Sequence, residues 1–168
     1  MILALVGSLL SALPLPDYEQ ALLSEAEQEV DQLVARGKVS EANEFLTRFR
    51  THVADDARLI YSQGLTQRLL GNPEEAKALL EESLLQDPEL AQSWYDLGEV
   101  LLVLDVQSEA ESAFKKASQL SIDHPNGWAA PFRLAELAGE KKNTAAFEGW
   151  LEEAIRRGFS FQQIVWGS

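Results

Sequence analysis

Residues 91–120, AQSWYDLGEVLLVLDVQSEAESAFKKASQL, contain the pattern that decides the fold. From Trp94, apolar or small residues recur at i+3, i+4 and i+7, which is the spacing of one face of an amphipathic helix. The polar stretch 105–108 interrupts this face. A second helical stripe follows, made of Ala110, Phe114, Ala117 and Leu120. The stretch therefore predicts two helices joined by a short turn.

The same pattern recurs along the chain at an interval of 34 residues, so that Gly64 aligns with Gly98. A turn residue, four further residues and an alanine recur as GKVSEA at 37–42, GNPEEA at 71–76 and DVQSEA at 105–110. A fourth copy aligns if three residues are inserted near 121–127, since loops between helices tolerate insertions. A period of this length indicates helical hairpins that stack in a row and bury their apolar faces against their neighbours.

Small residues recur where the two helices of each unit would approach one another. Glycine or alanine lets two backbones come close, and a large side chain can then fill the space beside the small residue. We expect this close contact at Gly64, Gly98 and Ala135 on the first helices, and at Ala42, Ala76 and Ala110 on the second helices.

These residues resemble the tetratricopeptide repeat (TPR). The third unit carries most of its pattern, with Trp94, Leu97, Gly98, Ala110 and Phe114. The second unit matches at Ile60, Gly64, Ala76, Leu80 and Pro88. The resemblance implies an all-α chain, folded as a right-handed α-solenoid of about four helix-turn-helix repeats.

We divide the chain into an N-terminal segment at 1–22, a TPR-like domain at 23–161 and a C-terminal cap or tail at 162–168. The repeats within the domain are 23–56, 57–90, 91–127 and 128–161. The apolar stretch 2–13 is open to three interpretations: a helix packed on the first repeat, the junction to a preceding domain, or a weak signal-like segment. We expect a cytoplasmic protein, or an exported or membrane-associated one if 2–13 is a signal or an anchor.

The composition excludes several classes of function. The net charge is −13, from 27 acids and 14 bases, and no run of three Lys or Arg occurs, so a nucleic-acid partner is not expected. The chain has no cysteine, which excludes disulfides, thiolate metal sites and a cysteine nucleophile. The acids favour a basic partner, although acids also keep outer helix faces solvated.

No catalytic motif is present, so we expect a chain that is not an enzyme and that binds neither a cofactor nor a metal. The phosphate loop, the serine elbow and the HExxH helix are all missing. His52, near Asp55 and Asp56, is assigned to the loop between units one and two. His124 is assigned to the inserted loop, and we interpret both histidines as solvated loop residues.

The resemblance implies that the first helix of each repeat lines a concave binding face. The positions carried over for partner binding are Arg58, Tyr61, Leu65, Arg68, Gln92, Tyr95, Asp96, Glu99, Phe132, Arg133 and Glu136. Tyr61, Tyr95 and Phe132 hold one position in successive units and predict an aromatic ladder, since aromatics are frequent interface anchors. The alternative is that these rings pack between neighbouring helices. The Lys and Asn of the carboxylate clamp are replaced by Glu27 and Asp31, so chaperone C-termini are excluded as ligands.

The sequence thus predicts a non-catalytic interaction module or adaptor. Its partner would be a protein or peptide with basic and apolar residues, bound on the concave face. Two alternatives stay open. One is an accessory TPR domain of a larger, enzymatic protein. The other is a structural solenoid that self-associates through apolar residues near its end, namely Phe159, Phe161, Ile164, Val165 and Trp166.

Overall fold

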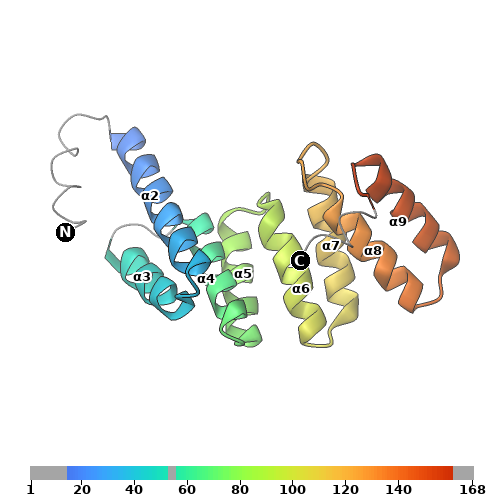
Figure 1. Ribbon diagram of the computed structural model, residues 1–168, viewed down its shortest axis with the longest axis horizontal. Coiled ribbons are helices and arrows are strands. Elements are labelled where there is room, and N and C mark those ends of the chain that lie inside the picture. Colours follow the sequence, from blue (N-terminus) through green and yellow to red (C-terminus); the bar gives the residue numbers. More distant parts are fainter. Residues whose placement is uncertain (1–14, 53–55, 161–168) are drawn as a thin grey trace.

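The computed structural model describes residues 15–52 and 56–160. In Figure 1 the helices follow one another along the long axis of the molecule, from α2 at one end to α9 at the other. Eight helices lie within the described residues: α2 (Leu15–Ala35), α3 (Val39–His52), α4 (Ala57–Leu69), α5 (Pro73–Gln86), α6 (Ala91–Val103), α7 (Gln107–Leu120), α8 (Ala129–Glu140) and α9 (Thr144–Arg156).

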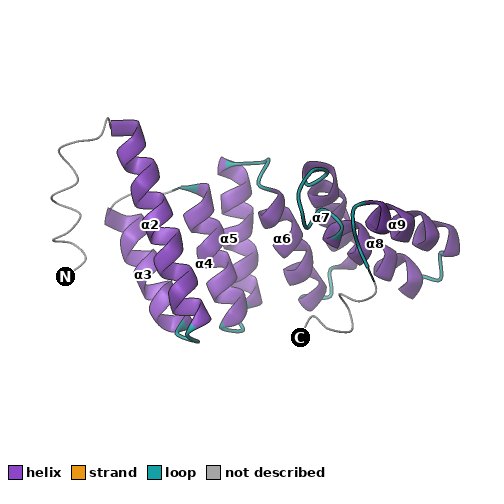
Figure 2. Ribbon diagram, turned by 45° about the horizontal axis from the view of Figure 1, so that its top comes forward, coloured by secondary structure: helices purple, strands orange, loops and turns teal. Residues whose placement is uncertain are grey.

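The helices pack in consecutive pairs. The first or A helix of each pair (α2, α4, α6, α8) packs against the second or B helix (α3, α5, α7, α9), and each B helix packs against the next A helix. The A helices α2, α4 and α6 also contact one another in order. The described part of the chain contains helices and loops without strands (Figure 2). The predicted all-α architecture of about four helix-turn-helix repeats is confirmed.

The predicted close contact between A and B helices is also confirmed. A Cβ atom on Gly98 would lie 2.7 Å from the ring of Phe114, and one on Gly64 would lie 3.1 Å from the side chain of Leu80. Ala76 and Ala110 on the B helices are fully buried. The small residue in each pair therefore makes room for a large side chain from the facing helix.

The turns between A and B helices share one backbone conformation. Gly37, Gly71 and Asp105 all have positive φ, of 72°, 81° and 60°. Lys142 takes the same place in the fourth unit, with φ of 55°. It follows Asp105 by the interval of 34 plus the three inserted residues. Glycine adopts this region without steric cost, so the recurring turn residue in the sequence reflects a left-handed position that ends each A helix.

The core runs along the interior of the row. In the third unit Phe114, Val100 and Leu101 are buried, and Trp94 is half-buried at the edge of the same cluster. The Trp94 indole N–H donates to the carbonyl oxygen of Pro88 at 2.9 Å, which explains why its ring stays at the edge.

Two details differ from the sequence-based expectations. α2 begins at Leu15 rather than at position 23, because Pro16 falls in its first turn, where no backbone N–H donor is needed. His52 is the last residue of α3 rather than a loop residue, and its Nδ1 lies 2.8 Å from the carbonyl oxygen of Arg48. The stretches 2–13 and 162–168 lie outside the described residues, as does Asp55.

Candidate functional site

The eleven predicted site residues come from three consecutive A helices, α4, α6 and α8. We call them the A-helix face: Arg58, Tyr61, Leu65, Arg68, Gln92, Tyr95, Asp96, Glu99, Phe132, Arg133 and Glu136. They fall on equivalent positions of the repeat: Tyr61 and Tyr95 are 34 residues apart, and Phe132 follows Tyr95 by 37 because of the three-residue insertion. Side-chain contacts between α4 and α6, and between α6 and α8, link five of these residues directly: Tyr61, Arg68, Asp96, Glu99 and Arg133.

A buried carboxylate joins α4 to α6 on this face. Tyr61 donates its hydroxyl hydrogen to Asp96 Oδ2 at 3.0 Å, and Arg68 lies 3.3 Å from Asp96 Oδ1. Only 9% of Asp96 is exposed. Burial raises the pKa of Asp96, while Arg68 and the Tyr61 hydroxyl act in the opposite direction. Burial also raises the pKa of Tyr61, and the adjacent Asp96 raises it further, so this hydroxyl remains a donor.

A second ionic group joins α6 to α8. The Arg133 guanidinium bonds to Glu99 at 2.6 Å and 3.1 Å and to Glu136 at 2.6 Å. Burial alone would lower the pKa of Arg133, but its hydrogen bonds to both carboxylates raise it. Burial, followed by the charge of Glu99, raises the pKa of Tyr95 to about 12, which keeps its hydroxyl protonated at neutral pH. The charges at the centre of the face are therefore largely satisfied within it.

The three rings of the expected aromatic ladder are directed to other partners. Tyr95 meets Phe114 edge-on, with ring centroids 5.5 Å apart. Phe132 stacks on Phe159 at 4.5 Å, and Tyr61 engages Asp96 through its hydroxyl. The ring contacts of Tyr95 and Phe132 are therefore with Phe114 in the B helix α7 and with Phe159 after α9, and not with one another. All three rings are half-buried, so each still presents part of its surface.

The outer members of the face contribute less to these networks. The Arg58 backbone N–H donates to Asp56 Oδ1, the N-cap of α4, and its side chain lies 3.6 Å from Glu27. Leu65 is half-buried, and Gln92 is exposed at the start of α6. Phe159, assigned from sequence to an exposed apolar surface, is only 4% exposed because it packs on Phe132 and Trp128. The other four residues of that proposed surface lie outside the described residues.

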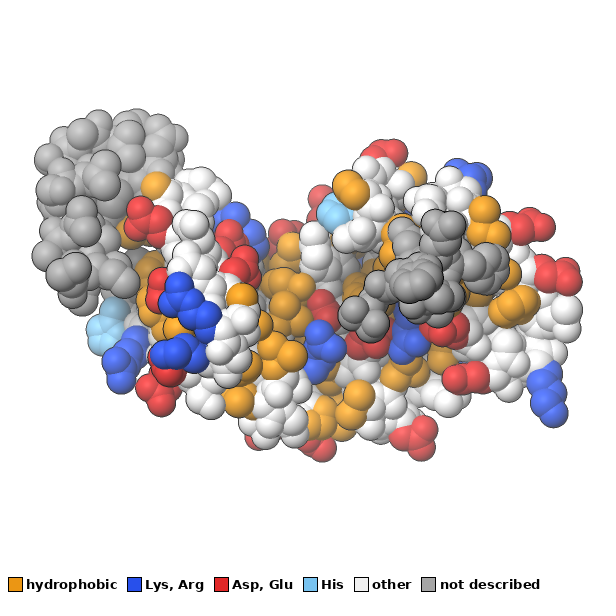
Figure 3. All heavy atoms as spheres, in the orientation of Figure 1, with side chains coloured by type: hydrophobic (Ala, Val, Ile, Leu, Met, Phe, Trp, Pro, Cys, Tyr) orange, Lys and Arg blue, Asp and Glu red, His pale blue; other side chains and the backbone are white. Residues whose placement is uncertain are grey.

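A hollow of about 550 Å³ opens beside the first turns of α6. Figure 3 shows the molecule hollowed along its upper edge, with hydrophobic, acidic and basic side chains mixed below it. The walls of the hollow come from the turn before α6, the start of α6, the end of α7, the loop 121–128 and the start of α8. Its lining residues are Glu89, Ala91, Gln92, Tyr95, Asp96, Ala117, Leu120, Ser121, His124, Asn126, Trp128, Ala129 and Ala130.

Only Gln92, Tyr95 and Asp96 of this lining belong to the positions predicted for partner binding. Glu89, His124, Asn126 and Trp128 were missed, because they lie in loops whose course the helical repeat does not predict. The three-residue insertion near 121–127 was the available indication. His124 was interpreted as a solvated loop residue; it is exposed, but it also lines the hollow, and its Nδ1 accepts from the Asn126 backbone N–H at 3.1 Å.

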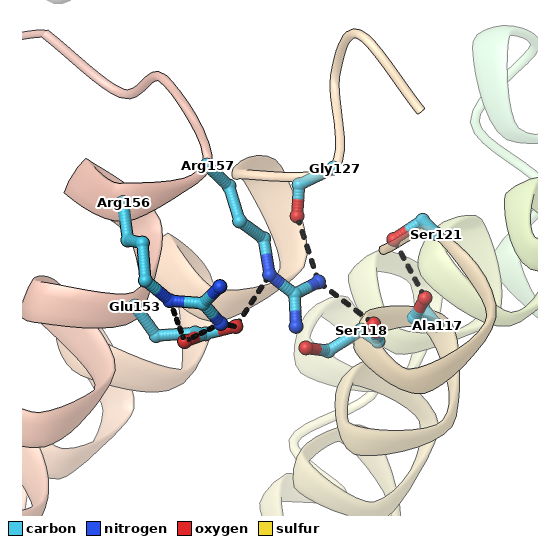
Figure 4. Close-up of polar contacts among 7 residues, drawn as sticks. All are labelled: Ala117, Ser118, Ser121, Gly127, Glu153, Arg156 and Arg157. Atoms are coloured by element: carbon cyan, nitrogen blue, oxygen red, sulfur yellow. Dashed lines mark hydrogen bonds and ion pairs between the residues drawn. The ribbon is translucent and has the colours of Figure 1, made fainter. Parts of the chain in front are cut away.

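The loop 121–128 is held by an arginine from the end of the fourth unit. Figure 4 shows Arg157 reaching back from α9, with Nη1 donating to the carbonyl oxygens of Ser118 at 2.8 Å and Gly127 at 3.3 Å. Glu153 fixes the same guanidinium by accepting from Nε at 2.6 Å. A Cβ on Gly127 would lie 2.2 Å from the Ser121 carbonyl oxygen, so the backbone closes tightly at this glycine.

The described residues offer little for other kinds of site. They contain no group of three or more His, Asp or Glu residues arranged to hold a metal ion. None of their helices combines the length and the apolar character that crossing a membrane requires. The hollow, which combines an aromatic and a polar lining, is a candidate ligand site.

No protein-family model matches the chain. A stretch of 83 residues is 31% identical to the cytochrome c-type biogenesis protein CycH of Pseudomonas aeruginosa. The match covers 49% of this chain but only 20% of that protein, so most of the relative's length has no counterpart here.

The fold is similar to several solved structures. MamA superposes with a TM-score of 0.70 at 16% identity, over 84% of this chain and 85% of that one. YrrB, described as a TPR protein with an unusual peptide-binding site, gives 0.67 at 15% identity, over 89% and 75%. PcrH, solved in complex with the chaperone binding region of PopB, gives 0.61 at 21% identity, over 75% and 98%. The chain has the TPR fold, and the resemblance inferred from its sequence is confirmed.

Proposed function

We propose that this chain, which has the TPR fold, is a non-catalytic protein-interaction module that binds a segment of a partner protein on its A-helix face. The observation that carries the proposal is the hollow beside α6, which continues from the face through Tyr95 and Asp96. Its volume of about 550 Å³ lies within the ~300–1,000 Å³ that is usual for ligand sites. Two proteins of similar fold support a peptide-like ligand. PcrH was solved with a region of PopB, and YrrB is described by its peptide-binding site.

The chemistry of the face favours a partner segment with an apolar anchor and some basic residues. Tyr95 offers a half-buried ring whose hydroxyl stays protonated. Glu99 and Glu136 share a single arginine, so the cluster of Arg133 with these two residues carries one excess negative charge. Such charges steer association and fix register more than they add affinity.

Selection of peptides from a random library on the immobilised protein tests this proposal. The affinity of a selected peptide is then measured by calorimetry for the wild type and for Tyr95→Ala, together with the unfolding free energy of each. We expect Tyr95→Ala to weaken binding by about 1–3 kcal/mol, as truncation of a buried interface aromatic does.

The matched control is Phe147→Ala, which removes another partly exposed ring, 36% exposed, on the B helix α9. Its affinity should equal that of the wild type. Equal losses of affinity in both variants would indicate that the binding site does not lie on the A-helix face. A Tyr95→Ala protein that is destabilised but binds with unchanged affinity would make the ring a packing residue only.

A second candidate function follows from the match to CycH. We propose that the partner belongs to the maturation of c-type cytochromes, because the matched relative is named for cytochrome c-type biogenesis. Deleting the gene from its host and measuring covalently bound haem in c-type cytochromes tests this. A marked decrease, restored by the wild-type gene but not by Tyr95→Ala, supports it, and unchanged haem content contradicts it.

A further inference from the structure

We propose that the hollow beside α6 is a pocket for one Lys or Arg side chain of the partner, held between aromatic walls and the carboxylate of Glu89. This inference rests on the proposed function, since it assigns a chemical identity to one contact of the partner segment. It adds residues that the repeat pattern does not mark, chiefly Glu89 and Trp128.

The charge of the hollow favours a cation. Of the described residues that line it, none is Lys or Arg, whereas Glu89 and Asp96 are acids. The Asp96 carboxylate is already engaged by Tyr61 and Arg68. The exposed Glu89 carboxylate forms no ion pair with the described part of the chain, although its backbone N–H donates to Asp87. Glu89 therefore keeps a negative charge that an incoming cation can neutralise.

His124 also lines the hollow, and its Nδ1 accepts a hydrogen bond from the Asn126 backbone N–H at 3.1 Å. The polar lining also includes the side chains of Gln92, Ser121 and Asn126, whose oxygens can accept hydrogen bonds from a cationic side chain.

The walls of the hollow suit a long cationic side chain. Tyr95 and Trp128 both line it, and a Lys or Arg cation near the face of an aromatic ring is attracted by the ring quadrupole. Ala117 and Leu120 add apolar surface for the methylene stem, which Lys and Arg bury while the charged end remains near water. One side chain thus meets apolar, aromatic and anionic surface in one place.

The wall that carries His124, Asn126 and Trp128 is formed before any ligand arrives. Arg157 holds the carbonyl groups of Ser118 and Gly127, and Phe159 packs its ring on Trp128 with centroids 5.4 Å apart. A pocket whose loop is already ordered avoids the entropic cost of ordering it on binding. A Lys or Arg is therefore met by a fixed site rather than by a loop that must close on it.

The test uses three peptides of alanine and leucine that are identical except for one central residue: Lys, Arg or norleucine. Norleucine keeps the apolar stem of lysine and removes the charge. Each peptide is titrated into the ¹⁵N-labelled full chain, and the Trp128 indole and the Ser121 and Asn126 amide signals are followed. We expect saturable shifts of these signals with the Lys and Arg peptides, and binding at least tenfold weaker with norleucine.

Glu89→Gln keeps the shape of the side chain and removes its charge, so the Lys and Arg peptides should bind about threefold to tenfold more weakly. The norleucine peptide should be unaffected. The matched control is Glu75→Gln, an exposed acid in the first turn of α5 that does not line the hollow, which should leave all three affinities unchanged.

The outcomes separate this inference from the proposed function. Equal binding of the Lys, Arg and norleucine peptides, with shifts on the A-helix face, would retain a peptide-binding module but overturn the cation pocket. Shifts confined to Tyr61, Arg133 or other residues outside the hollow would do the same. A complete absence of shifts with all three peptides would overturn both proposals for ligands of this chemistry.

Discussion

Two junctions between repeat units differ in how the connecting segment is held in place. One lies between units two and three, and the other lies between units three and four. At the first, the turn between α5 and α6 is short and is closed locally by the Trp94 indole on the Pro88 carbonyl. At the second, α7 and α8 are separated by a longer loop, and Arg157 from α9 holds it. The conformation of the inserted loop therefore depends on a residue from the following hairpin.

The interiors of the two junctions differ as well. Ser83 at the first junction donates to the Ala57 carbonyl oxygen at 2.8 Å and lies 3.0 Å from the Ser93 hydroxyl, and both serines are fully buried. Ala117 and Ala130, both buried, take the aligned places at the second, and neither has a hydroxyl group. The comparison shows that added loop length can form a wall of a hollow once a distant side chain holds the loop in place.

The largest effect is expected for Gly127→Ala in the longer loop. Its Cβ would meet the Ser121 carbonyl oxygen at 2.2 Å, and a backbone atom cannot move aside as a flexible side chain can. We expect a loss of about 3 kcal/mol in unfolding free energy, measured by urea denaturation. The matched control is Gly149→Ala in α9, where a Cβ meets nothing within 4 Å and should stabilise the helix by about 1 kcal/mol. Equal effects of the two substitutions would mean that the loop is not tightly closed.

A smaller loss is expected for Arg157→Met, which keeps the length of the stem and removes the hydrogen bonds to Ser118, Gly127 and Glu153. Since the Arg157 side chain is only 10% exposed, the carbonyl groups lose a charged donor in a sheltered place. We expect a loss of about 2 kcal/mol, together with faster hydrogen exchange in the loop. The control is Arg156→Met, whose side chain is 69% exposed and should be nearly neutral. Unchanged exchange in Arg157→Met would contradict the proposed fastening of the loop.

The smallest of the three effects is expected at the shorter junction. Ser83→Ala removes one buried hydroxyl, so the Ala57 carbonyl oxygen loses one donor and the Ser93 hydroxyl loses the partner it has in the wild type, at a cost of about 1–2 kcal/mol. Thermal unfolding of Ser83→Ala, Ser93→Ala and the double variant measures the coupling between them. We expect the double variant to lose less than the two single losses added together. Strict additivity would show that the hydroxyl pair does not act as a unit.

The sequence by itself determined the repeat and therefore the fold. Gly64, Gly98, Ala76 and Ala110 recur because two backbones approach closely at fixed positions, and a local geometric requirement of this kind leaves a residue type at a fixed spacing. The recurring turn residues, such as Gly71, have the same origin, because a left-handed backbone position ends each A helix. The amphipathic spacing also predicted that Tyr61, Tyr95 and Arg133 lie on A helices, which form one face.

Only the tertiary structure decided what those side chains contact. Asp96 is a sequence-predicted binding residue, yet its carboxylate is engaged by Tyr61 and Arg68 on the neighbouring helix. The hollow depends on loop residues such as Trp128, and its wall is held by Arg157, which lies 30 positions beyond Gly127. The period of a repeat describes what every unit shares. A site that arises where one unit departs from the others depends on contacts between residues far apart in the chain, and periodicity contains no information about those contacts.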